Sequence, residues 1–326
     1  MTRHSAVPPP VTAVLDASSR WLPARMGRVE EMLRELGGGH GEVLAADAAM
    51  TLEAGGKRLR PMLVLLCAGE EGGEEAIRAA TAIELIHMAT LVHDDVLDDA
   101  PLRRGRPTVG ATSGRERATA TGDLLFSRAF ALLAEAGAER AIEQLSEASV
   151  ALARGELAQR RDAYDTGISE ALYLDRCRLK TGSLFSCACL LGRSEAEEAA
   201  LFRAFGAEVG LAFQLLDDVL DVTGPPERTG KARGTDLLDG TVTLPLILAR
   251  ERDASLAELD LRSLDAGGAE AVCDRIAATG VLEEVRAGAG RRVELAKRAL
   301  ELRRALEPDR RQLLELVAEG IVERYS

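Results

Sequence analysis

The sequence predicts an all-helical protein folded as a single domain. Ala, Leu, Glu and Arg are abundant among its 326 residues, whereas aromatic residues make up only 3%, and this mixture favours helix over sheet. From Trp21 onward apolar residues recur at helical spacing, without the alternation of a half-buried strand. No proline occurs between Pro107 and Pro225, which favours several long helices there because proline breaks helix interiors.

The chain shows no linker of domain-boundary character and no fixed-period repeat. Residues 1–20, with Pro8 to Pro10, predict a flexible leader, and residues 21–326 then form one domain. Short glycine-rich or charged segments mark the joints between the expected helices. These joints are residues 69–76, 100–110, 134–139, 191–197 and 223–241.

Charge and cysteine usage exclude some classes of partner and compartment. The net charge is −12, from 41 basic and 53 acidic residues, which argues against a nucleic-acid partner. The five cysteines are odd in number and form no CxxC pair, so we expect free thiols in a reducing compartment. There is no signal-peptide pattern, and unbroken apolar runs such as 62–68 are too short to span a bilayer. We therefore expect a cytoplasmic protein without a transmembrane segment.

Residues 79–99 read as one helix that ends in a cluster of aspartates, Asp94, Asp95, Asp98 and Asp99. Steps of four place Asp94 and Asp98 on one row, at the helix end that already carries negative dipole charge. A bound cation is the simplest compensation, and oxygen-only ligands favour Mg²⁺. The arginines that follow suit direct contacts with phosphate. The cluster therefore predicts a metal–diphosphate site, with a solvated acidic helix end as the alternative.

A second acidic cluster repeats the first one. The pentapeptide DDVLD occurs at 94–98 and again at 217–221. Gln214 lies one turn before the second carboxylate, and Gly206 and Gly210 permit close helix packing upstream. The carboxylates of this cluster are Asp217, Asp218 and Asp221. Two such helix ends facing each other would hold one diphosphate from both sides through several metal ions.

Basic residues in three other segments are candidates for anion binding. The segment GGKRLRP at 55–61 places a glycine-flanked lysine before a helix start, which suits an anion, although it lacks the spacing of a Walker loop. A surface basic turn is the alternative. Further candidates are Lys180, Thr181 and Lys231, and His87 lies two turns before Asp94. For His87 a buried core histidine is the alternative reading.

Taken together these motifs resemble the trans-isoprenyl diphosphate synthases, the polyprenyl synthetase family, of the long-chain type. The resemblance runs from about residue 45 to the C-terminus, through GGKRLRP, ELIHMATLVHDDVLDDAPLRRGRPT, KTGSLF, FQLLDDVLD and GKARGTDLLDGTVTLPL. It implies an all-α isoprenoid-synthase-like bundle around a central cavity, usually in a homodimer. It also implies a prenyltransferase that condenses an allylic diphosphate with isopentenyl diphosphate, using about three Mg²⁺ ions per site.

The resemblance also implies a role for each motif residue. Asp94, Asp98 and Asp217 correspond to metal ligands, which together with Lys180 are the expected catalytic residues. Asp95, Asp218 and Asp221 correspond to residues that support the metals. Arg103, Lys180, Thr181, Gln214 and Lys231 correspond to the allylic diphosphate site. Lys57, Arg60, His87 and Arg104 correspond to the isopentenyl diphosphate site. One departure is Thr241, where the family often has a lysine.

The residues before the first cluster bear on product length. Ala89 and Thr90 are small. The resemblance implies that bulky aromatic residues at these two positions would end growth of the prenyl chain early. Ile86 lies about 12 Å below Asp94 at 1.5 Å per residue. The sequence therefore predicts an open tunnel and a product of about heptaprenyl to decaprenyl size, with a farnesyl or geranylgeranyl product as the alternative. Phe126 and Phe130 form either its floor or ordinary core packing.

Three other classes share part of this pattern. A class I terpene cyclase has aspartate-rich helices but not the GGKR and paired RR elements. A non-catalytic subunit of a heteromeric synthase is expected to have lost an aspartate motif, and both are present here. An HD-type phosphohydrolase would use His93 and Asp94 but needs more histidines than this chain has.

We also allow for transient membrane contact during release of a long product.

Overall fold

The computed structural model describes residues 14–38, 42–53, 56–103, 105–192, 196–224, 233–301 and 306–323. Its regular structure is almost entirely helical, so the prediction of an all-α fold is confirmed. The first half of the chain forms α2 Leu22–Gly38, α3 Glu42–Glu53, α4 Leu59–Ala68, α5 Gly73–Leu97, α6 Val109–Ser113, α7 Arg115–Glu135 and α8 Glu139–Arg161.

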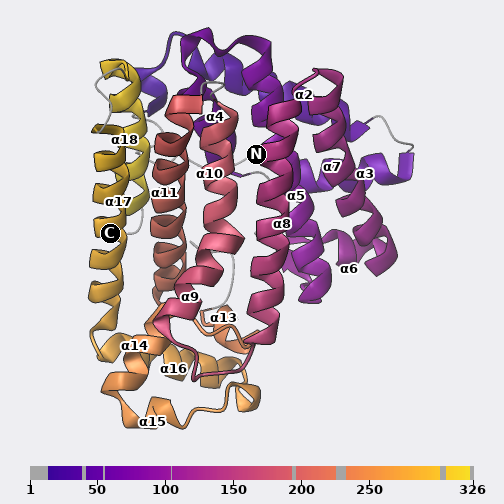
Figure 1. Cartoon of the computed structure of the whole chain (residues 1–326). Helices are drawn as coiled ribbons and strands as arrows, with labels where there is room; N and C mark the ends of the chain where they lie inside the picture. Colours follow the sequence, from indigo (N-terminus) through magenta and orange to yellow (C-terminus); the bar gives the residue numbers. More distant parts are fainter. Residues whose placement is uncertain are drawn as a thin grey trace.

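The second half continues the bundle and closes one end of it. Its helices are α9 Glu170–Cys177, a π-helical turn at Arg178–Gly182, α10 Ser183–Leu191, α11 Ala196–Thr223, α13 Thr235–Leu238, α14 Leu244–Arg252, α15 Ala254–Ala257, α16 Ala266–Ala278, α17 Val281–Glu301 and α18 Pro308–Glu323. Short 3₁₀ turns occupy Glu70–Gly72 and Leu261–Ser263. Helices α17, α11, α10, α8 and α5 stand side by side, and α14 to α16 cover the lower end (Figure 1).

Small residues let the central helices approach closely. A Cβ added at Gly206 would lie 2.6 Å from the Phe185 carbonyl oxygen of α10, and one at Gly210 would lie 2.9 Å from the Gly182 Cα. The expected close packing at both glycines is therefore confirmed. Gly155 of α8 packs closely against the π-helical turn in the same way, because a Cβ added there would lie 2.6 Å from the backbone nitrogen of Lys180. These approaches draw α8, α10 and α11 together beneath the acidic clusters.

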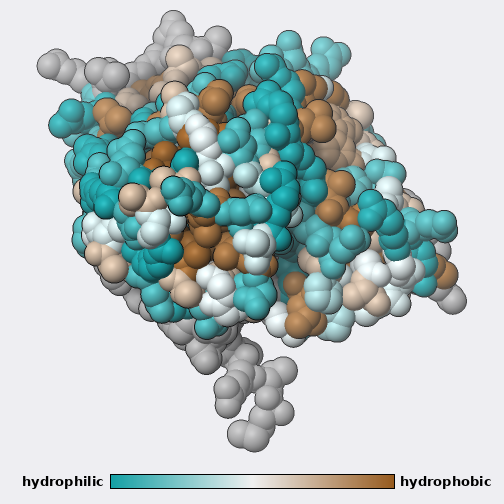
Figure 2. Space-filling view, turned by 90° about the horizontal axis from the view of Figure 1, so that it is seen from below, coloured by the Kyte–Doolittle hydropathy of each residue, from teal (hydrophilic) through white to brown (hydrophobic). Residues whose placement is uncertain are grey.

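One helix is long and apolar enough, by length and composition, to cross a membrane. It covers Glu198–Thr223 within α11, and half of its most apolar window is buried inside the protein. It packs against α10 and α17 and carries Asp217, Asp218 and Asp221. These contacts identify it as a core helix of the bundle. A mainly hydrophilic surface, broken by several hydrophobic patches, covers the lower end of the molecule (Figure 2).

Two short features differ from the sequence expectation. Part of the segment 1–20, expected as a flexible leader, is ordered: Val14 and Ser18 are buried, and Val14 belongs to the core. The segment 100–110, expected as an irregular joint, contains a hairpin in which strand Leu102–Arg103 pairs with strand Arg106–Pro107. This hairpin directs Arg103 back toward the end of α5.

Candidate active site

The first acidic cluster lies at the end of α5, as predicted. The helix ends at Leu97, Asp98 caps it by donating its N–H to the Asp94 carbonyl (2.9 Å), and Asp99 adopts a left-handed conformation with φ 47°. Asp98 and Asp99 are exposed, whereas Asp95 is buried. The four carboxylates therefore divide into exposed groups at the helix tip and inner groups, Asp94 and Asp95.

The Asp94 carboxyl group is the inner acid of this cluster. Burial raises its pKa from 3.8 to about 6, the charges of Lys180 and Arg103 act against that rise, and Glu156 and Asp98 add to it. Burial is the largest of these effects, and a buried carboxylate is costly to ionise unless opposite charge compensates it. The position thus favours a positively charged ligand.

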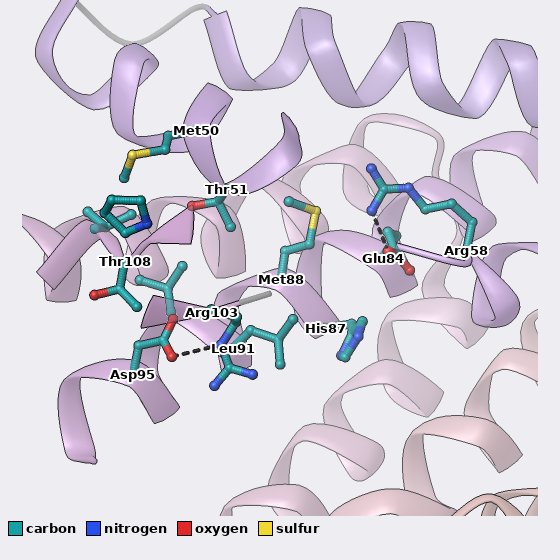
Figure 3. Close-up of a pocket in the computed structure, with 13 residues that line it drawn as sticks. Met50, Thr51, Arg58, Glu84, His87, Met88, Leu91, Asp95, Arg103 and Thr108 are labelled. Carbon is teal, nitrogen blue, oxygen red and sulfur yellow. Dashed lines mark hydrogen bonds and ion pairs between the residues drawn. The ribbon is translucent and has the colours of Figure 1, made fainter. Parts of the chain in front are cut away.

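Asp95 faces the hairpin and pairs with Arg103. The Arg103 Nε donates to Asp95 Oδ1 at 2.7 Å, which fixes this arginine at the mouth of a pocket between α3, α5 and the hairpin (Figure 3). Most of the remaining lining is apolar, including Met50, Met88 and Leu91. Asp95 therefore orients the Arg103 guanidinium at this pocket.

Two further residues line the same pocket: His87, which was predicted, and Arg58, which sequence reasoning missed. His87, expected to bind isopentenyl diphosphate, lines it next to Arg58. Arg58 precedes α4 in a left-handed conformation (φ 47°), and its guanidinium donates to Glu84 at 2.8 Å and to Glu30 at 2.5 Å. The two neighbouring cations have other surroundings. Lys57 is exposed, and the Arg60 guanidinium lies 4.6 Å from the centre of the Phe185 ring. Arg58 thus anchors the segment that carries the two predicted cations.

The second acidic cluster is organised around Asp218, which is buried. Tyr173 donates its hydroxyl to one carboxylate oxygen (2.5 Å), and Gln214 donates its amide to the other (2.8 Å). The Thr181 hydroxyl donates in turn to the side-chain amide oxygen of Gln214, Oε1, at 2.6 Å. Burial and the charge of Asp236 raise the pKa of Asp218 to about 8. Both Asp218 oxygens are thus used internally, which leaves the exposed Asp217 as the carboxylate of this cluster that faces solvent.

Residues of α8 connect the two clusters, and sequence reasoning did not find them. The Lys180 ammonium lies 2.5 Å from Glu156 Oε2 and 3.3 Å from the side-chain amide oxygen of Gln159, Oε1. Arg160 Nη2 donates to Asp98 Oδ1 at 2.7 Å, and its Nε lies 3.4 Å from Glu156 Oε1. Positions 156, 159 and 160 share one helix face, the only signal that the sequence offered. A chain of alternating charges therefore runs from Asp98 to Lys180, next to Thr181.

Other predicted residues have mixed placements. Arg104 and Lys231 lie outside the described residues. Thr241 is half-buried, and its N–H donates to the Asp236 carbonyl at 2.7 Å. The buried Arg176 donates to the carbonyl of the next residue, Val242. The segment that departs from the family pattern is thereby held against α9 by an arginine.

The expected tunnel residues lie below the first cluster along α5 and α7. Ile86 and Ala89 have no accessible surface, and Thr90 is buried with its hydroxyl bonded to the His87 carbonyl. Phe126 and Phe130 on α7 are half-buried, with ring centroids 6.0 Å apart. A prenyl chain passing Ala89 must therefore displace neighbouring side chains.

The carboxylate oxygens of the two clusters suit a hard cation that takes its remaining ligands from water or a substrate. Within the described residues, no group of three or more His, Cys, Asp or Glu side chains is arranged to hold a metal ion. Mg²⁺ commonly binds through one or two carboxylates and completes its octahedron with water and phosphate oxygens. Asp94, Asp98 and Asp217 fit that pattern.

Comparison with known proteins identifies the family. The polyprenyl synthetase family model matches residues 42–270, and the chain belongs to this family of prenyltransferases. It is 44% identical over 241 residues to "Heptaprenyl diphosphate synthase component 2" of Geobacillus stearothermophilus, covering 72% of this chain and 75% of that one. It is 38% identical over 263 residues to an all-trans-nonaprenyl-diphosphate synthase of Rhodobacter capsulatus, covering 77% and 80%.

A solved structure agrees over nearly the whole length. The polyprenyl synthase of Caulobacter crescentus, complexed with calcium and isoprenyl diphosphate, has a TM-score of 0.89 and 33% identity, and the match covers 97% of this chain and 98% of that one. The resemblance inferred from the motifs is confirmed.

Proposed function

We propose that the protein condenses an allylic diphosphate with successive molecules of isopentenyl diphosphate, head to tail, to make a long-chain all-trans polyprenyl diphosphate with Mg²⁺ as cofactor. The observation that carries this proposal is the polar network that joins the two acidic clusters. Asp98, Arg160, Glu156 and Lys180 lead from the first cluster to Thr181, and from there Gln214 leads to Asp218. Negatively and positively charged side chains thus alternate between the two acidic clusters and form one continuous site.

The chemistry follows from this arrangement. Asp94, Asp98 and Asp217 would hold Mg²⁺, about three ions per site, which would supply positive charge against the leaving diphosphate. Lys180 and Arg103 hold the same diphosphate, and Lys57, Arg60 and His87 hold isopentenyl diphosphate beside it. The allylic carbon–oxygen bond breaks to give a carbocation, the double bond of isopentenyl diphosphate attacks it, and a proton leaves to the released diphosphate. Apolar walls such as Met88 and Leu91 exclude water that would trap the cation.

The long-chain product rests on two supports. Ala89 and Thr90 place no bulky side chain one turn below Asp94, so neither residue would block the growing chain as a large aromatic side chain would. The names of the relatives, heptaprenyl and nonaprenyl diphosphate synthases, point the same way. A farnesyl or geranylgeranyl product is the alternative.

Product analysis tests the proposal. Purified protein is incubated with Mg²⁺, labelled isopentenyl diphosphate and either dimethylallyl, geranyl or farnesyl diphosphate, and the dephosphorylated products are sized by mass spectrometry. We expect prenols of about seven to ten units, and EDTA abolishes them because the diphosphate loses its counter-charge. Products that stop at three or four units would overturn the long-chain assignment while leaving the reaction class intact.

We also propose a homodimer that packs through the outer face of α8. Val150 and Leu157 are 58% and 69% exposed, and their spacing of seven places them on one face of the helix. Light scattering should give twice the chain mass of 34.8 kDa. Val150→Glu with Leu157→Glu should yield monomers, whereas Leu295→Glu on α17 should not. A monomeric, inactive wild type would instead indicate a missing second component, as the name of the Geobacillus relative suggests for that protein.

We place the protein in the cytoplasm, with transient membrane contact at the mouth of the site during product release. Leu97 and Leu102 support this contact because they are 42% and 55% exposed, directly beside the first acidic cluster. Apolar side chains at this position suit a product whose tail is insoluble in water.

A further inference from the structure

We propose that Arg160 is a built-in counter-ion of Asp98, which leaves this carboxylate for Glu156 when a divalent cation binds. The inference rests on the proposed metal site and assigns a role to a residue outside the motifs of the family. Arg160 Nη2 donates to Asp98 Oδ1 at 2.7 Å, across 62 residues of sequence. The Arg160 guanidinium therefore occupies the position at the Asp98 carboxylate where a metal ion would bind.

A second acceptor for the guanidinium is already in place. Glu156 lies one turn before Arg160 on α8, and its Oε1 is 3.4 Å from Arg160 Nε. In the described structure the other Glu156 oxygen receives the Lys180 ammonium at 2.5 Å. When Lys180 turns to a bound diphosphate, Glu156 loses that partner and becomes available to the guanidinium. When the site is loaded, Asp98 therefore exchanges Arg160 for the metal ion, and Glu156 exchanges Lys180 for Arg160. Each charged group keeps a partner of opposite charge.

Electrostatics require such an exchange. A divalent ion and a guanidinium about 5 Å apart repel by roughly 1.7 kcal/mol even in a medium as polar as water. The Arg160 and Asp98 side chains are 40% and 38% exposed, so their pairing is weak enough to be broken, within the ~0–1 kcal/mol of surface ion pairs. The exchange thus disfavours metal binding before diphosphate arrives and favours binding of the two together.

The neighbouring arginine provides a matched control. Arg161 carries the same charge one residue further along α8, but it pairs with Asp162 at 2.8 Å. Arg161→Gln removes one positive charge from the same helix end without touching Asp98. Arg160→Lys keeps the charge at the site and loses the planar, forked donor.

Binding of Mn²⁺ to the substrate-free protein tests the inference without turnover. Mn²⁺ accepts the same oxygen ligands as Mg²⁺, and free Mn²⁺ is measured by electron paramagnetic resonance. Arg160→Gln should lower the dissociation constant for Mn²⁺ about fivefold, the equivalent of roughly 1 kcal/mol. Arg161→Gln should change it less than twofold, and Arg160→Lys should fall between Arg160→Gln and wild type. Adding inorganic pyrophosphate should reduce the difference between Arg160→Gln and wild type, because pyrophosphate draws Lys180 away from Glu156.

The outcomes separate this inference from the proposed function. If Arg160→Gln binds Mn²⁺ no more tightly than Arg161→Gln does, the counter-ion role is wrong although the metal site stands. If wild type binds no Mn²⁺ even with pyrophosphate, the proposed metal site itself fails. Thermal unfolding of each variant verifies that it is folded, and should Arg160→Gln not fold, an Arg160→Lys variant with unchanged Mn²⁺ affinity overturns the proposal.

Discussion

Asp94→Asn should lower the rate of prenyl transfer by about 10²–10³-fold, the loss typical of removing one group that stabilises developing charge, and should make the metal-free protein more stable. Asparagine keeps the shape of the side chain but removes the carboxylate that faces Lys180 and Arg103. A loss of activity together with a gain in stability distinguishes a site residue from a structural one.

The stability gain has a definite pH dependence. Burial raises the pKa of Asp94 from 3.8 to about 6, so the folded protein holds this proton more tightly than the unfolded chain does. The free energy of unfolding therefore falls as pH rises from about 4 to 6, and the penalty is complete above pH 6. Two pKa units correspond to about 3 kcal/mol. Denaturant unfolding with EDTA should show Asp94→Asn more stable than wild type at pH 7.5 and equal to it near pH 4.

Asp99→Asn provides the control for this experiment. Asp99 is exposed, five residues further along, and its left-handed conformation suits asparagine. We expect it to change the free energy of unfolding by less than about 0.5 kcal/mol. If Asp94→Asn is instead less stable than wild type at pH 7.5, the carboxylate makes net favourable contacts, and the reading of Asp94 as a high-energy group waiting for a cation is wrong.

The sequence predicted the fold and the acidic clusters because both depend on local patterns. The proline-free stretch and the helical spacing of apolar residues predicted the helical region that contains α7 through α11. The repeated DDVLD placed its carboxylates at helix ends whatever the tertiary arrangement. Even the close approach at Gly206 and Gly210 followed from the absence of a side chain.

The rest of the site depended on which helices meet. Glu156 and Arg160 are unremarkable on a charged helix until Gly155 brings α8 against Lys180. The partner of Asp98 lies 62 residues away, a distance that no pattern along the chain encodes. Arg58 was missed because its partners Glu30 and Glu84 are 28 and 26 residues away in the sequence. The tight packing at Ile86 and Ala89 likewise reflects side chains from neighbouring helices.

Arg58→Met should destabilise the protein by about 3–5 kcal/mol, because it leaves a buried carboxylate without its partner. The Arg58 and Glu84 side chains are only 9% and 4% exposed. Burial alone lowers the pKa of Arg58, but the bonds to Glu30 and Glu84 outweigh burial and raise it. Methionine fills the space of the aliphatic stem but offers no donor. Denaturant unfolding at neutral pH measures the loss, and Arg28→Met, which breaks only the exposed pair with Glu31, should cost less than about 1 kcal/mol.

A double variant separates the buried charge from the shape of the site. Adding Glu84→Gln to Arg58→Met removes the stranded carboxylate, and we expect it to recover part of the lost stability. The substrate contacts should not recover, because Arg58 also anchors the segment that carries Lys57 and Arg60. The KM for isopentenyl diphosphate should stay raised about tenfold in both variants, the equivalent of one charge-assisted contact of ~1.5 kcal/mol, while the KM for the allylic substrate changes little. Equal increases in both KM values would mean that Arg58 supports the whole fold and not one substrate site.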